Sequence, residues 1–155
     1  MGGVEIRIKG LDEAIARYAP VFAGNDGVEL ADTLGALGVR QTQRRIYSEK
    51  TSPAGAAWKP NRQGTSILFA SGLLAGSIRH TAAPGAATWG SPLIYAAIHN
   101  FGGAIRPREK KALRFPGAPH PVAQVVMPQR EYLGLSAENA REMMEMVETY
   151  FTGRL

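Results

Sequence analysis

The spacing of apolar residues changes along the chain, and each spacing predicts a different element. Residues 4–9 alternate between apolar and charged side chains, a period of two that predicts a half-buried strand ending at Gly10. Residues 11–19 carry apolar side chains at helical spacing and predict a short helix that Pro20 stops or bends. These residues therefore predict a strand followed by a helix.

A longer helix is predicted from about Asp26 to Tyr47. Two stripes follow its helical spacing, one of leucines and one of small residues: Leu30, Leu34 and Leu37, and Ala31, Gly35 and Gly38. Each glycine costs a helix about 1 kcal/mol relative to alanine, so the second stripe predicts a backbone packed very close to that face. The polar residues 40–45 are expected to be solvated or to lie at an interface.

A loop and a hairpin are predicted next. Residues 48–66 are rich in serine, proline, glycine and charge, which is typical of a long loop, and Trp58 is expected to anchor it to a surface. After a short apolar segment, residues 77–82 and 86–90 predict two strands joined by a Pro-Gly turn. Trp89 is expected on the apolar face of this hairpin.

Residues 92–103 predict a short helix with apolar residues on one side, namely Tyr95, Ile98 and Phe101. Gly102 is the expected C-cap in a left-handed conformation, and Gly103 is expected to let the chain leave sharply.

The last part of the chain combines a basic loop, a strand and a helix. Residues 103–121 hold five basic side chains and four prolines and predict a long, mobile loop. Residues 122–127 predict a strand, and Ser136 is the expected N-cap of the final helix. The predicted apolar face of that helix consists of Ala140, Met143, Met144, Val147 and Phe151.

Composition narrows the class of protein. The 155 residues are 45% hydrophobic and 20% charged, which suits one globular domain over residues 1–155. No apolar run reaches the roughly 18 residues of a membrane span, so no membrane contact is expected. Cysteine is absent, which excludes disulfides, thiolate metal sites and cysteine nucleophiles.

The net charge of +5 is unevenly distributed. Residues 40–62 and 106–130 each hold six basic side chains and one acidic one, whereas residues 1–39 and 131–155 are acidic overall. Nucleic-acid binding, charge complementarity between subunits and two solvated surface stretches are all compatible with this pattern.

The residues that carry chemistry do not form a catalytic pattern. His80, His99 and His120 show no metal-type spacing, and residues 63–105 contain no acidic side chain that could orient His99. The glycine-bearing stretches match no phosphate-binding motif. His99 is therefore expected to be a packed, hydrogen-bonded structural residue, and no catalytic, cofactor or metal site is predicted.

Four stretches together resemble the phage virion morphogenesis family, the Mu-G-like or tail-completion proteins of tailed phages. They are "PAGAAWKP", "ILFASGLLAGSI", "WGSPLIYAAIHNFGG" and "MPQREYLGLS", in this order and with near-usual spacing. The residues that meet the family pattern are Pro53, Gly55 and Trp58; Leu68, Ser71, Gly72 and Leu74; Tyr95, Ala96, Ile98, His99, Gly102 and Gly103; and Pro128, Arg130, Tyr132, Leu133 and Gly134. Glu131 stands where proline is common.

The resemblance implies a non-enzymatic structural part of the virion, at the head–tail junction or the tail end, made in the bacterial host cytoplasm. It implies an α+β fold, with a small antiparallel sheet packed against one long helix and a C-terminal helix, beside a long basic loop. Its implied partners are copies of itself in a ring, with a hexamer favoured, and neighbouring neck, connector or tail-tube proteins. Whether it is a tail terminator, a stopper or another neck ring stays open.

The charge blocks give a specific hypothesis for the subunit interface, in which basic surfaces meet acidic ones, including the last helix, on neighbouring subunits. The basic residues concerned are Arg40, Arg44, Arg45, Arg106, Arg108, Lys110, Lys111 and Arg114. The alternative is a DNA-binding accessory protein of the packaging or neck region. A ring would multiply the basic charge and hold DNA strongly by counterion release, whereas passage of a genome requires weak friction, so passing DNA contact is secondary to protein contact.

Overall fold

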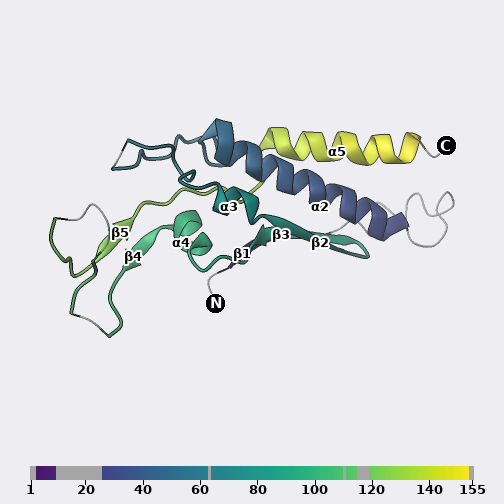
Figure 1. Cartoon of the computed structure of the whole chain (residues 1–155). Helices are drawn as coiled ribbons and strands as arrows, with labels where there is room; N and C mark the ends of the chain where they lie inside the picture. The colour runs from purple at the N-terminus through teal and green to yellow at the C-terminus, as the bar shows by residue number, and fades with distance from the viewer. Residues whose placement is uncertain (1–2, 10–25, 63, 110, 115–118, 154–155) are drawn as a thin grey trace.

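A computed structural model describes residues 3–9, 26–62, 64–109, 111–114 and 119–153 of the chain. The helix predicted over residues 11–19 lies outside these ranges. Figure 1 shows an elongated molecule, with two long helices and a sheet on one side and a narrow two-stranded projection at the opposite end.

The sheet in the body has three antiparallel strands: β1 (Val4–Ile8), β2 (Arg79–Ala83) and β3 (Ala86–Ser91). Their order is β1-β3-β2, so β3 lies in the centre. Ile6 of β1 and His80 of β2 both pair with Trp89, which puts the three side chains on the same face of the sheet. The predicted strand near the N-terminus and the predicted hairpin are both confirmed.

Helix α2 (Asp26–Arg44) covers that face and continues into a π-helical turn, η2 (Arg45–Glu49). Its leucine stripe is buried, with Leu30 and Leu34 each 1% exposed. A Cβ added at Gly35 would lie 2.7 Å from the His80 ring, and one added at Gly38 would lie 2.5 Å from the Trp89 ring. The close approach predicted from the small-residue stripe is confirmed, but aromatic rings from the sheet make it, not a backbone.

The predicted basic loop contains a strand that the sequence pattern did not indicate. β4 (Gly103–Ile105) pairs antiparallel with β5 (Val125–Met127), and an isolated bridge joins Leu113 to Val122. We call residues 103–127 the arm. β5 is shorter than the predicted strand, and the arm projects from the body in Figure 1.

Two short helices flank the hairpin of the sheet: α3 (Leu73–Gly76) precedes β2, and α4 (Ala96–Phe101) connects β3 to the arm. Gly102 is the C-cap of α4, as expected, but its φ of 70° combines with a ψ of −174°, which is extended and not left-handed helical. The predicted apolar side of α4 does not enter the core: Phe101 is 62% exposed, and the buried residues are Ala96 and Asn100. Because α4 has only six residues, its inward face consists of two positions one turn apart, and Ala96 and Asn100 occupy them.

Helix α5 (Ala137–Thr152) runs antiparallel to α2 (Figure 1). Ser136 is its N-cap, as predicted, and it forms a capping box with Asn139. Met143 and Phe151 are buried, whereas Met144, also placed on the apolar face by the sequence, is 65% exposed. None of the helices within the described ranges is long and apolar enough to cross a membrane. The fold is α+β, as the family resemblance implied.

The contact between Gly38 and Trp89 gives a first test of the packing. We expect Gly38→Ala to lower the free energy of unfolding by about 2 kcal/mol, because the clash with a buried indole outweighs the gain in helix propensity. Gly76→Ala is the control, since a Cβ there meets nothing within 4 Å. Urea unfolding measures both, and equal stabilities of the two variants would contradict the close packing.

Candidate assembly surface

Residues 128–135, which we call the strap, run between the 48–66 loop and α4 and are bonded to both. The Arg130 side chain donates from Nε to the Lys59 carbonyl (2.9 Å) and from Nη2 to the Pro60 carbonyl (3.2 Å). Its backbone N–H donates to the His99 carbonyl at 2.9 Å. One residue thereby joins two parts of the motif pattern that are distant in the sequence.

Asn100 holds the strap from the side of α4. Its Oδ1 accepts hydrogen bonds from the backbone N–H groups of Tyr132 and Leu133, both at 3.0 Å. The Tyr132 hydroxyl donates to the Ala96 carbonyl at 2.9 Å. Burial raises the pKa of Tyr132, so the phenol stays protonated and keeps this bond. Trp58 completes the set by donating from Nε1 to the Glu131 carbonyl at 3.2 Å, which confirms its predicted role as the anchor of the loop.

Two glycines of the motif pattern lie where the strap touches its neighbours. A Cβ on Gly102 would lie 2.7 Å from the Gln129 backbone nitrogen, and one on Gly134 would lie 2.5 Å from Cγ of Pro53. Both have positive φ values, 70° and 151°. Only glycine satisfies the space and the backbone conformation together at these positions.

Arg45 fastens the other side of the strap, and its prediction as an interface residue is wrong. The residue is 1% exposed. Its Nη1 donates to the carbonyls of Tyr132 (3.0 Å) and Gly134 (2.9 Å), and its Nη2 donates to Oδ1 of Asn139 (2.5 Å). Burial lowers the pKa of Arg45, but a guanidinium remains charged at neutral pH. Gln41 and Thr42 are also buried, so one side of the polar end of α2 forms an internal polar layer with Arg45, while Arg40 and Arg44 are exposed.

Sequence reasoning missed Asn100 and Asn139 as the amides that organise this layer. Asn100 stands four residues after Ala96 on α4, and the two are the buried positions of that helix. This spacing of four residues could have pointed to Asn100, because residues one helical turn apart lie on the same face and the small Ala96 is suited to face inward. The partners of Asn100 are backbone groups, which no side-chain pattern reveals, and the Arg45 side chain that binds Asn139 lies far away in the sequence.

The remaining motif residues take local roles. Gly72 has a φ of 75° at the start of α3, Gly55 has a φ of 87° in an exposed turn, and Gly103 has a φ of 136° at the start of β4. Pro128 is half-buried where β5 joins the strap, and Leu133 is 5% exposed in the core. The four motif stretches therefore build one connected scaffold around the strap.

His99 belongs to this scaffold. Its ring packs edge-on against Tyr95, with 5.9 Å between centroids. Burial, and then the charge of Arg130, lower the pKa of His99, so the imidazole is neutral at neutral pH. The ring is packed as expected, but its buried Nδ1 has no hydrogen-bond partner among the described residues, so the expected hydrogen bond is absent at that atom. Within the same residues, no group of three or more histidine or acidic side chains is placed to hold a metal ion.

A pocket of about 240 Å³ opens beside His99, and Arg130 and Tyr95 also line it. Its mouth carries exposed apolar side chains: Leu73 is 65% exposed, Tyr95 is 40% exposed and Phe69 is 39% exposed. We call these three residues the apolar rim. Apolar clusters of this kind on a protein surface are typical of contact with another protein.

The predicted interface arginines divide between the body and the arm. Arg40 is exposed on α2, and Arg44 pairs with Glu49 (2.8 Å) and with Glu142 of α5 (3.0 Å). A bond to Glu49 is the main cause that raises the pKa of Arg44. The predicted contact between a basic block and the last helix thus occurs within one chain at Arg44, and the role of Arg40 and Arg44 in contacts between subunits stays a prediction.

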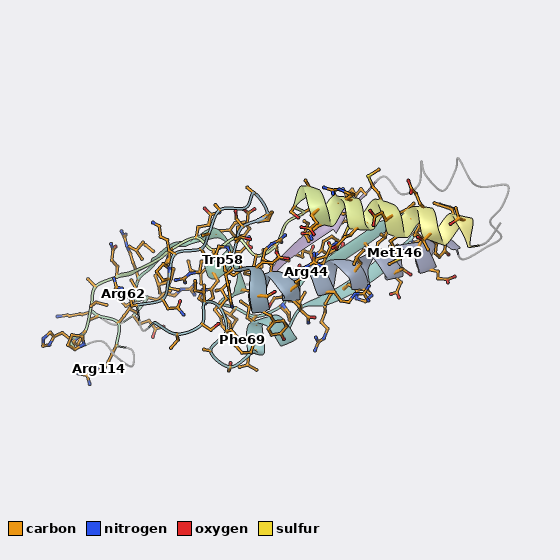
Figure 2. All side chains as sticks on the ribbon, turned by 90° about the horizontal axis from the view of Figure 1, so that it is seen from above. Arg44, Trp58, Arg62, Phe69, Arg114 and Met146 are labelled. Carbon is orange, nitrogen blue, oxygen red and sulfur yellow. The ribbon has the colours of Figure 1, made fainter. Side chains whose placement is uncertain are left out.

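The arm carries the other basic residues at its surface. Arg106 donates from Nε to Oε1 of Gln124 at 3.1 Å. Arg108, Lys111 and Arg114 are exposed and form no ion pair with any residue that the structure describes. Lys110 lies outside the described residues. Figure 2 places Arg62 and Arg114 in the same half of the molecule.

A model of the phage virion morphogenesis family matches residues 6–152, nearly the whole chain. No curated protein and no solved structure matched. The matched range contains the strap, the arm and all four motif stretches.

The buried position of Arg45 leads to a second prediction. We expect Arg45→Met to lower the free energy of unfolding by about 3 kcal/mol, because two strap carbonyls and the Asn139 side chain lose a charged donor inside the protein. Arg40→Met removes the same charge from an exposed position of the same helix and is expected to change stability by less than about 0.5 kcal/mol. Chemical denaturation measures the free energy of unfolding of both variants. An equal, small loss in the two would show that the Arg45 guanidinium does not hold the strap.

Gly102 gives a third prediction, because strain and crowding coincide there. Gly55→Ala places an alanine at a φ of 87° with nothing within 4 Å, whereas Gly102→Ala adds a clash with the Gln129 backbone. We expect Gly55→Ala to cost about 1 kcal/mol and Gly102→Ala about 3 kcal/mol or more. Thermal unfolding measures the difference, and similar losses in both variants would mean that the strap is not packed against Gly102.

Proposed function

Because the chain belongs to the phage virion morphogenesis family, we propose that it is a structural part of the virion at the head–tail junction or the tail end. In this proposal, copies of the chain assemble into a ring, with six copies favoured, and the ring joins neighbouring virion parts. Membership of the family establishes the coarser role in building the phage particle.

The arm is the observation that carries the proposal. β4 and β5 pair over only three residues each, all residues of β4 are exposed, and Val126 of β5 is 64% exposed. A two-stranded ribbon without a core is at best marginally stable in water and needs a further surface to pack on. Neighbouring subunits of an assembly supply such a surface.

The body of the molecule suits a joining role rather than a catalytic one. The strap uses its polar groups to bond the loop and α4 to each other, and Arg45 bonds the strap to the first turn of α5. His99 is neutral and lies within this framework, and its backbone carbonyl binds the strap. This arrangement gives a rigid base from which the arm and the apolar rim meet other chains.

The basic arm also suits contact with DNA, but the apolar side chains favour a protein partner. Ile105 and Val126 are exposed on the two paired strands of the arm, and the apolar rim lies on the body. Phosphate backbones attract cations and offer no surface that covers apolar side chains. We therefore rank contact with passing DNA below contact with another protein as the role of the arm.

A shortened arm tests the proposal. Ile105 pairs with Val125, so replacing residues 106–124 by Asn-Gly closes the two strands with a two-residue turn. We expect this variant to keep the melting temperature of the body and to lose the closed oligomer that native mass spectrometry detects for the full chain. Antibody labelling of purified particles is expected to place the full chain at one end of the tail. A full chain that stays monomeric at every concentration and is absent from finished particles would overturn the proposal.

A further inference from the structure

Exposed charges of opposite sign lie at opposite ends of the molecule. The arm, with Arg108, Lys111 and Arg114, forms one end, and α5 extends toward the other (Figure 1). Figure 2 shows the same separation between Arg114 and Met146. The arm therefore does not reach the far half of α5 in its own chain, although the two surfaces have complementary charge.

The outward side of α5 is an acidic stripe. Glu138, Glu145 and Glu148 lie on this side together with one basic residue, Arg141, so the side is acidic overall. The four residues follow one another at intervals of three or four, all are exposed, and none is ion-paired with a residue in the described ranges. Glu142 differs, because it faces α2 and binds Gln41 (2.7 Å) and Arg44 (3.0 Å). These bonds, chiefly the one from Gln41, lower the pKa of Glu142.

Apolar side chains accompany the charges on both surfaces. Met144, 65% exposed, lies beside Glu145 and Glu148 on α5. On the arm, Val126 is 64% exposed and Ile105 is 38% exposed. Each surface thus combines charge with an apolar contact, and the charges are of opposite sign.

We propose that the arm of one copy lies along the outward side of α5 of the next copy, with Arg108 and Lys111 facing Glu145 and Glu148. This inference rests on the proposed self-assembly and names the two surfaces that carry it. The contact joins one end of a chain to a different surface of its neighbour, so it is heterologous, and repetition of such a contact closes a ring when the rotation between copies allows it.

A second copy explains the paired features better than DNA does. DNA would attract the arm but be repelled by the acidic side of α5, and it would leave Met144 exposed. Exposed ion pairs are individually weak, worth roughly 0–1 kcal/mol each, so the apolar contact and the repetition around a ring are needed for a stable assembly. The contact is also expected to weaken as salt rises above about 0.15 M, because the charges are at the surface.

Charge reversal on one surface at a time tests the contact. Arg108→Glu with Lys111→Glu makes the arm acidic, and Glu145→Lys with Glu148→Lys makes the outward side of α5 basic. Each variant then repels its own copies, and we expect self-association at least tenfold weaker than in the native chain, by analytical ultracentrifugation at low salt. An equal mixture is expected to assemble with alternating variants, because every arm then meets a side of opposite charge.

The controls separate this contact from the wider proposal. Arg7→Glu with Lys9→Glu gives the same charge change on exposed residues of and beside β1 and is expected to leave assembly unchanged. Recovery in the mixture also shows that both variants are folded.

If the native chain assembles and the reversed variants assemble equally well, or if the mixture stays dissociated, the arm–α5 contact is wrong while self-assembly stands. If the reversed arm loses binding to duplex DNA and assembly is unaffected, DNA is the partner of the arm. A native chain that never assembles overturns both proposals.

Discussion

The guanidinium of Arg45 is the interaction on which the arrangement of the other elements depends. It is buried at the end of α2 and donates to two carbonyls of the strap and to Asn139 at the start of α5. A buried charge is costly unless its donors are satisfied. The strap and the first turn of α5 must therefore stay within hydrogen-bond distance of α2, which fixes where α5 begins and the direction in which the strap leaves the arm.

The strap links the buried Arg45 to the segments at the base of the arm. Arg130, Asn100 and Trp58 bond it to the 48–66 loop and to α4, while Gly102 and Gly134 let the segments approach without a Cβ between them. The arm leaves the body between α4 and the strap, so its base is held on both sides. A projecting element with little packing of its own can be aimed at a partner only if its base is rigid.

Internal and external charges have separate roles in this molecule. Arg44, Arg45 and Glu142 bind across the α2–α5 boundary, so the basic end of α2 stabilises the fold of one chain. The exposed cations of the arm and the exposed glutamates of α5 lack such partners within the described residues. In the proposed self-assembly, charges left unpaired at opposite ends of the elongated molecule direct the copies into one orientation, since complementary potentials act on association and on register.

The elements that could be predicted from the sequence alone are those that depend on residues close together in the chain. Alternation in β1, the leucine and small-residue stripes of α2, the Pro-Gly turn and the Ser136 cap each depend on residues close together in the chain. The four motif stretches likewise identified the family and the scaffold residues. Only the tertiary structure decided that Arg45 is internal and Met144 external, that rings from the sheet fill the space beside Gly35 and Gly38, and that β4 pairs with β5. Those outcomes depend on backbone carbonyls and side chains that lie far apart in the sequence, and the pattern of one segment contains no information about which distant group will lie against it.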